Sequence, residues 1–134
     1  MLMSDIISTN PYLMFMLENF GINLVVHDMT VAQLCAKNEI SIELFLSFTN
    51  LFNGFYPSPS VKYTFSDLKT ILLFLRNSHQ YYLNEKYPEI RKYIAQMYEI
   101  NEQASVLMVE KFFDEYFSEV REHFYTRTRW FLRI

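Results

Sequence analysis

The sequence contains few of the residues from which disulfide-bonded or turn-rich proteins are built: it has 1 cysteine, 2 glycines and 4 prolines in 134 residues. A lone cysteine, Cys35, cannot form an intrachain disulfide, and this suits a protein of the reducing cytoplasm. So few glycines exclude a glycine-rich phosphate loop and disfavour a sandwich of many short strands. The longest apolar run, residues 71–75, is too short to cross a bilayer, and the N-terminus lacks the pattern of a secretory signal. We therefore expect a cytoplasmic protein without a membrane span.

Basic charge is also scarce, because 12 lysines and arginines face 15 acidic residues and the formal net charge is −3. A protein that binds nucleic acid nonspecifically needs a basic face, which this balance does not support. Residues 30–50 have the rhythm of a helix-turn-helix, but its second helix, 41–50, holds an acid and no base. Such a helix is poorly suited to contact phosphates or base edges, so a structural role is favoured over DNA reading.

Apolar and aromatic residues are abundant, at 51% and 18%, which predicts a packed core and an all-α fold rather than disorder. In the first 55 residues, three helices are expected. The first starts at Asn10-Pro11 and ends at Gly21, the second is capped by Asp28 or Thr30, and the third is capped by Ser41.

Residues 56–64 contain two prolines and two serines and are interpreted as a linker between this module and a second one, residues 65–134. In the second module, Ser66 is expected to begin a long helix that Pro88 kinks or restarts. Asn101 is expected to cap a last long helix. Two long helices joined in this way form half of an up-down bundle.

Three histidines, His27, His79 and His123, are the main candidates for chemistry. His79 and His123 come late in the two long helices, so antiparallel pairing could bring both imidazoles together, and Glu119 lies one turn before His123. Imidazole and carboxylate groups from several helices are how bundles hold non-haem iron. The sequence therefore predicts a possible metal site at His79, His123 and Glu119.

Simpler interpretations of these residues stay open. Histidines on an apolar helix face are more often hydrogen-bonded core residues than metal ligands. Glu115 and Glu119 could be solvated or paired with Lys111 and Arg121, and His27 fits a surface loop. The aromatic residues Phe112, Phe113, Tyr116 and Phe117 fit packing, and Cys35 fits a small core residue. No catalytic constellation is recognisable, so whether the protein is an enzyme stays open.

Several segments resemble iron–sulfur cluster repair proteins of the ScdA/YtfE type, whose second domain is a hemerythrin-like HHE cation-binding domain. Residues 17–23 and 30–35 resemble the N-terminal module of that family, and residues 77–90 and 110–124 resemble its first two bundle helices. The resemblance implies non-haem iron, held as a di-iron centre in intact relatives, and a role in oxidative and nitrosative stress. It places His79 and His123 at two of the family's iron ligands.

This sequence departs from the family pattern in ways that matter for metal binding. Val25 and Val26 stand where the family has adjacent cysteines, and Arg127 stands where a further glutamate ligand is expected. The sequence stops after the second bundle helix, and the segment 126–134 holds three arginines and no acid, which suggests a frameshift or premature stop. An incomplete metal site is thus expected.

A half-bundle should expose the apolar faces of its helices, so a homodimer formed through these faces is expected. Two alternatives to an iron-binding protein remain. One is a non-enzymatic regulatory or interaction module with a helix-turn-helix-like N-terminal region. The other is a degenerate fragment without activity.

Overall fold

The computed structural model describes residues 1–26, 28–56, 60–100 and 104–131, and every regular element in that part of the chain is helical. This confirms the all-α fold class. The chain divides into two compact units, Met1–Asn77 and Ser78–Ile134. The division falls inside α5 (Phe65–Tyr81), whereas the sequence suggests a linker at 56–64, of which residues 57–59 lie outside the described part.

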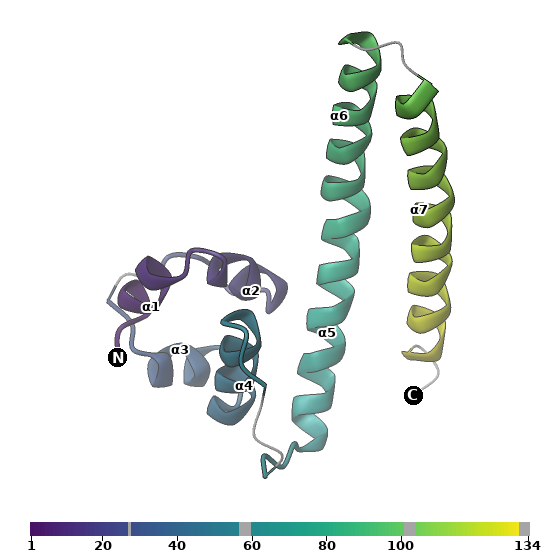
Figure 1. Cartoon of the computed structure of the whole chain (residues 1–134). Helices are drawn as coiled ribbons and strands as arrows, with labels where there is room; N and C mark the ends of the chain where they lie inside the picture. Colours follow the sequence, from purple (N-terminus) through teal and green to yellow (C-terminus); the bar gives the residue numbers. More distant parts are fainter. Residues whose placement is uncertain (27, 57–59, 101–103, 132–134) are drawn as a thin grey trace. The chain divides into compact units, whose positions relative to one another are not determined.

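The first unit contains four short helices and most of α5. They are α1 (Met3–Thr9), α2 (Leu13–Asn19), α3 (Val31–Lys37) and α4 (Ile42–Phe52). The three helices expected from the sequence correspond to α2, α3 and α4, and α1 precedes them (Figure 1). The turn after α2 ends at Gly21, whose positive φ of 74° a residue with a side chain rarely adopts.

Side-chain caps mark the beginnings of α3, α4 and α5. The Thr30 hydroxyl accepts a hydrogen bond from the Gln33 amide while the Gln33 side chain accepts one from the Thr30 amide, so a reciprocal capping box starts α3. Ser41 caps α4 by accepting from the Leu44 amide. The expectation that Ser66 caps α5 is wrong. Thr64 takes this place, because its hydroxyl accepts from the Asp67 amide at 3.1 Å.

Asp67 also joins two helix starts within the first unit. It is a buried carboxylate, and one of its oxygens accepts from the Ser41 hydroxyl at 2.6 Å while the other accepts from the Thr64 amide and hydroxyl. These hydrogen bonds, with that from Ser41 the largest cause, lower the pKa of Asp67 below its usual value. The start of α5 is thereby fixed to the start of α4.

A continuous apolar core fills the first unit. Phe20, Phe45, Phe48 and Phe74 form its aromatic centre, where Phe20 and Phe74 meet edge to face with ring centroids 4.7 Å apart. Cys35 is buried beside them, as expected for a small core residue. The other fully or nearly buried members come from α1 to α4 and their connections: Met3, Leu13, Met16, Leu17, Ile22, Val26, Val31, Leu34, Ile40 and Leu44.

The second unit is a helical hairpin. It begins with the end of α5, continues through a π-helical turn, η1 (Tyr82–Lys86), into α6 (Tyr87–Ile100), and returns along α7 (Ala104–Phe131). The sequence predicts a kink or restart at Pro88, but the helix runs without a break from η1 into α6, and what marks the proline is the π-helical turn before it. In an α-helix the proline ring would clash with a carbonyl one turn earlier. The wider turn η1 precedes the proline, and in it the Tyr87 amide donates to the Tyr82 carbonyl. The expected cap Asn101 lies outside the described residues.

Contacts between α6 and α7 show that the two helices are antiparallel (Figure 1). Tyr87 stacks on Phe113, whereas Tyr82, earlier in the chain, stacks on the later Phe117. At the same level, the Arg91 guanidinium contacts Asp114 at 2.8 Å and Glu110 at 3.2 Å. These half-exposed ion pairs add little energy, but their geometry agrees with the register of the hairpin.

Candidate functional site

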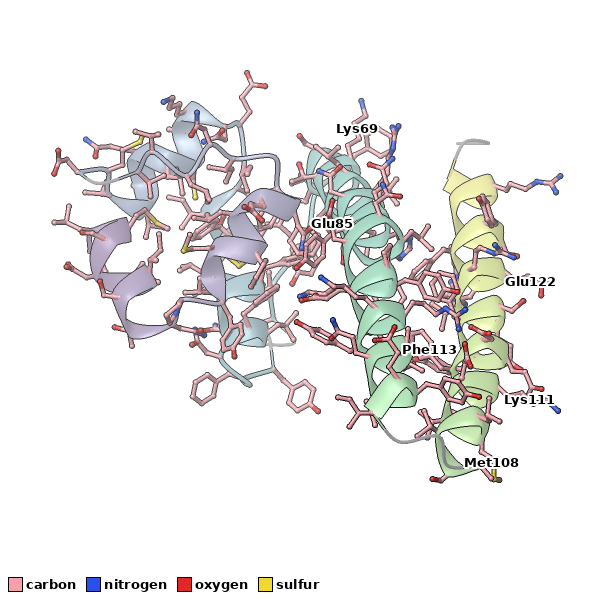
Figure 2. The ribbon with its side chains drawn as sticks, turned by 90° about the horizontal axis from the view of Figure 1, so that it is seen from above. Lys69, Glu85, Met108, Lys111, Phe113 and Glu122 are labelled. Carbon is pink, nitrogen blue, oxygen red and sulfur yellow. The ribbon has the colours of Figure 1, made fainter. Side chains whose placement is uncertain are left out.

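The hairpin has an inner stripe, which we define as the residues of α6 and α7 that face each other. Ile94 of α6 and Val106 and Phe117 of α7 are its buried members. Phe113 and Tyr87 are half-buried beside them. Figure 2 shows Phe113 on the side of α7 that faces α6, with Lys111 and Glu122 on the opposite side.

A second set of large apolar side chains on the same two helices is exposed. Phe112 is 69% exposed and Tyr93 is 56% exposed, although each is the immediate neighbour of an inner-stripe residue. We call this set the outer face. Its members are Tyr93, Met97 and Ile100 of α6 and Met108, Val109, Phe112 and Tyr116 of α7.

The outer-face residues of both helices lie on one side of the hairpin. Phe112 precedes Phe113, Tyr116 precedes Phe117, and Tyr93 precedes Ile94. Consecutive residues of an α-helix are rotated by roughly 100° about the helix axis. In both helices the outer-face residue comes one position before the inner-stripe residue, so the rotation has the same sense about each axis. Since the helices run in opposite directions, equal rotations about their own axes turn both sets toward the same side. The hairpin therefore has one continuous apolar face that nothing in the described part of this unit covers.

The expected aromatic packing in α7 is thus only half realised inside the chain. The sequence treats Phe112, Phe113, Tyr116 and Phe117 alike, but Phe113 and Phe117 pack against α6 while Phe112 and Tyr116 are exposed. The sequence does contain a signal for this difference. The aromatic residues come in adjacent pairs, and two adjacent residues of a helix cannot both point at the same partner helix.

His79 and His123 both contact the ring of Phe124. The His79 imidazole lies flat on Phe124, with ring centroids 4.0 Å apart. His123 meets the same phenyl ring edge to face at 6.1 Å. Burial, and then the charge of His123, lower the pKa of His79. His79 is consequently an inner, half-buried group, whereas His123 is exposed and precedes Phe124 on the outer side of α7.

Glu119, the third predicted metal ligand, is exposed one turn before His123. The two line a shallow hollow of about 480 Å³ together with Tyr82, Tyr116, Val120 and Phe124. The pKa of Tyr82 is raised, first by burial and second by the neighbouring Tyr116. The π-helical turn that carries Tyr82 therefore borders the same hollow, and such turns often occur at functional sites.

These groups do not by themselves complete a metal centre. Within the described residues, no three histidine, cysteine, aspartate or glutamate side chains are grouped so that they could hold an ion. Glu115, one turn before Glu119, is near the Lys111 ammonium at 4.0 Å, which agrees with the paired interpretation of that carboxylate. His27 lies outside the described residues, so its expected surface position stays a prediction.

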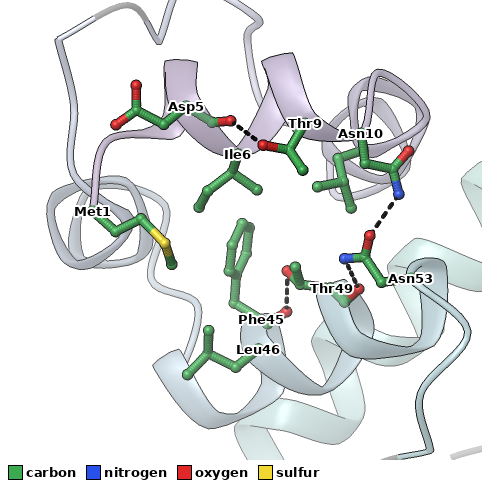
Figure 3. A pocket seen from close by; sticks show the side chains of 10 residues that line it. Met1, Asp5, Ile6, Thr9, Asn10, Phe45, Leu46, Thr49 and Asn53 are labelled. Carbon is green, nitrogen blue, oxygen red and sulfur yellow. Dashed lines mark hydrogen bonds between the residues drawn. The ribbon is translucent and has the colours of Figure 1, made fainter.

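The first unit has an apolar hollow of about 280 Å³ between α1, α2 and α4 (Figure 3). Ile6, Leu13 and Phe45 are among its apolar lining residues, and Asn10, Thr49 and Asn53 are among its polar ones. The donors of these three polar residues are engaged within the unit. The Asn10 amide donates to Asn53 Oδ1 at 2.8 Å, the Asn53 amide to the Thr49 carbonyl, and the Thr49 hydroxyl to the Phe45 carbonyl at 2.9 Å (Figure 3). These donors are therefore not free to bind a polar ligand in the hollow.

Two other sequence candidates find ordinary structural places. Burial and the charge of Glu43 raise the pKa of the Cys35 thiol to about 11, so it is a protonated core residue at neutral pH. In the helix-turn-helix-like segment, Leu44 and Phe45 of α4 are buried, and the exposed Ile42, Glu43 and Leu46 carry no positive charge.

Comparisons with known proteins add no relative: no protein-family model, no curated protein and no solved structure matches the chain. Among the described helices, none is both long enough and apolar enough to pass through a bilayer.

Proposed function

We propose that this protein is a self-associating helical module. In this proposal the second unit pairs with that of another copy, outer face against outer face, as a homodimer. A helix in a four-helix bundle packs against two neighbours and so buries two stripes roughly a quarter-turn apart. Both α6 and α7 have this pattern. The observation that carries the proposal is the exposure of Phe112 and Tyr116 on the same side of the hairpin as Tyr93 and Met97.

The chemistry of the outer face favours a second copy as the occupant. None of its seven residues is charged, so two identical faces can meet without like-charge repulsion. Symmetric pairing through one patch is the commonest way for a chain to form an oligomer. The large apolar side chains Phe112, Met108 and Tyr93 are of the kinds that contribute most to interface energies.

A matched pair of variants tests self-association. Phe112→Glu places a charge in the outer face, and Ser118→Glu places the same charge on an exposed position that points away from both stripes. We expect Phe112→Glu to weaken dimerisation by about 100-fold or more, as at a central interface residue, and Ser118→Glu to leave it unchanged. Light scattering after gel filtration measures both, with circular dichroism as the check on helix content. Equal behaviour of the two variants would contradict the proposal.

A second candidate function is binding of non-haem iron, in keeping with the resemblance to cluster-repair proteins that act in oxidative and nitrosative stress. It is supported by the proximity of His79 and His123, which share Phe124, and by Glu119 beside His123 in the hollow. Because the described part of one chain supplies too few grouped ligands, we propose that any iron binds to the assembled pair, where the ligand number doubles.

Metal analysis of the purified protein, before and after anaerobic loading with ferrous iron, tests this candidate. The expected result is iron in a fixed ratio to dimer, lost in His79→Ala and His123→Ala and retained in the control His27→Ala. Iron content that is equal in all of these variants, or near zero in the well-folded protein, would remove the candidate while leaving self-association intact.

A further inference from the structure

We infer that the shallow hollow on the hairpin binds a small organic cation, the ammonium or quaternary ammonium group of a larger ligand. The inference goes beyond the proposed self-association and does not depend on it. The hollow, of about 480 Å³, is lined by Tyr82 of η1 and by Tyr116, Glu119, Val120, His123 and Phe124 of α7. Only Tyr116 belongs to the outer face as well.

Half of the lining residues are aromatic. The Tyr82 ring meets Phe124 edge to face, with ring centroids 5.7 Å apart. Burial and, second, Tyr116 raise the pKa of Tyr82, so the two phenol groups are near each other. The face of an aromatic ring carries partial negative charge and attracts a cation, and proteins recognise quaternary ammonium groups with several such rings. The aromatic part of this wall therefore favours a positively charged ligand.

The rings differ in how much surface they offer to a ligand. One face of Phe124 is covered by His79, whose ring centroid is 4.0 Å away. Tyr116 is 49% exposed, and its ring is nearly parallel to that of Phe112 with centroids 6.4 Å apart, which is a loose contact. Tyr116 therefore offers the most accessible ring surface, and the half-buried Tyr82 continues the wall beside it.

Glu119 supplies the negative charge of the hollow. It is exposed, and none of the ion pairs formed by the described residues includes it. Glu115, one turn earlier, is near Lys111 instead. With His123 neutral, the lining carries a single negative charge, so the Coulomb energy favours a cation over a neutral or anionic ligand of the same shape.

Two positively charged residues of the same segments leave the hollow open to such a ligand. Lys86 of η1 is held by Glu89 at 2.8 Å, and its ammonium lies 5.8 Å from the centre of the Tyr81 ring. Arg127 is exposed one turn after His123 and is not a lining residue. Among the described residues, neither forms an ion pair with Glu119.

Three probes of similar shape and different charge test the inference on the full-length chain: tetramethylammonium, tert-butanol and pivalate. The protein is first treated with a chelator, so that no metal at Glu119 or His123 competes. Each probe is titrated near pH 8, where an ordinary histidine is neutral and a carboxylate is ionised. The NMR signals of the Tyr82 and Tyr116 rings report binding at the hollow. We expect a dissociation constant on the order of millimolar for tetramethylammonium, at least about tenfold tighter than for the other two probes.

Two variants, each with a control, assign the binding to the lining residues. Glu119→Gln removes the charge at nearly unchanged shape and should weaken tetramethylammonium binding about fivefold, whereas Glu99→Gln removes an exposed carboxylate at the far end of the hairpin and should leave it unchanged. Tyr116→Leu removes an aromatic face and should also weaken binding about fivefold. Its control is Tyr125→Leu, which removes an exposed tyrosine that does not line the hollow.

Equal affinities for tetramethylammonium and tert-butanol would show an apolar surface without selection for charge and would overturn the inference. Tighter binding of pivalate, or unchanged binding in Glu119→Gln, would overturn it as well. The proposed self-association is judged separately by light scattering of the same samples. A monomer that binds tetramethylammonium as expected would remove self-association alone, and a dimer without charge-selective binding would remove this inference alone.

Discussion

The two units of this protein bury their apolar side chains to very different degrees. Fourteen hydrophobic residues of the first unit are buried, from Met3 to Phe74, whereas in the described part of the second unit only Ile94, Val106 and Phe117 are. The second unit has comparable apolar material, but exposes much of it on the outer face. A chain segment whose large apolar side chains form one continuous exposed face is typical of an element that is completed by a partner. The first unit therefore buries a core of its own, whereas the second exposes the face through which we propose that it pairs.

The largest expected effect comes from removing core volume in the first unit. Phe45 is 1% exposed and stacks with Phe20, so Phe45→Ala should lower the free energy of unfolding by about 3–5 kcal/mol. The loss should not depend on protein concentration if the first unit is self-contained. Denaturant unfolding at two widely different concentrations measures this, and a loss that disappears at high concentration would break the distinction between the units.

A second prediction concerns Asp67, which holds the starts of α4 and α5 together. Asp67→Asn removes a charged acceptor of hydrogen bonds from Ser41 and Thr64 and should cost about 1.5–3 kcal/mol. Because the pKa of Asp67 is lowered in the folded protein, the native state binds fewer protons than the unfolded one in acid. The stabilisation is therefore full above the ordinary carboxyl pKa of about 3.9 and is lost as the pH falls below it.

Acid unfolding curves of the unmutated protein and Asp67→Asn should converge below that pH. Glu43, an exposed acid in the first turn of α4, provides the control variant Glu43→Gln. Curves of Asp67→Asn and the unmutated protein that stay parallel down to pH 2 would show that the carboxylate does not stabilise the first unit in this way.

The smallest expected effect is a pH dependence of the hairpin. The pKa of His79 is lowered by burial and by His123, so the folded hairpin resists protonation of this imidazole. An unfolded histidine titrates near 6.5, and stability should therefore fall as the pH drops through and below that value. In His79→Gln this fall should shrink, as followed by thermal melts of the hairpin between pH 8 and 5. An unchanged pH dependence would assign it to other groups.

Much of the fold could be anticipated from local signals. Thr30 and Ser41 start helices as their side-chain chemistry suggests, Gly21 ends one, and Pro88 follows a π-helical turn in a helix that does not break. The first helix, α1, was not anticipated because its seven residues, MSDIIST, are bounded by neither a capping side chain nor a helix-stopping glycine. Thr64 rather than Ser66 caps α5 because Asp67 is one turn beyond Thr64, a spacing that the sequence does contain.

The candidate site could be anticipated only in part. The positions of His79 and His123 along antiparallel helices do bring them near each other. Hydrophobic periodicity cannot tell which of two adjacent apolar stripes faces the neighbouring helix, because both have the same repeat. That choice places His79 inside against Phe124 and His123 outside, and it leaves Phe112 and Tyr116 exposed. Packing between the two helices, rather than the sequence pattern of either helix alone, decides which stripe is buried.

Sedimentation equilibrium of the unmutated chain tests the central claim most directly. Each chain has a mass of 16.2 kDa. The account predicts a reversible, concentration-dependent transition to a species of twice that mass, with half-association shifted to higher concentration by Phe112→Glu. A mass of 16.2 kDa at every concentration, from a protein whose helix content matches the structure, would contradict it.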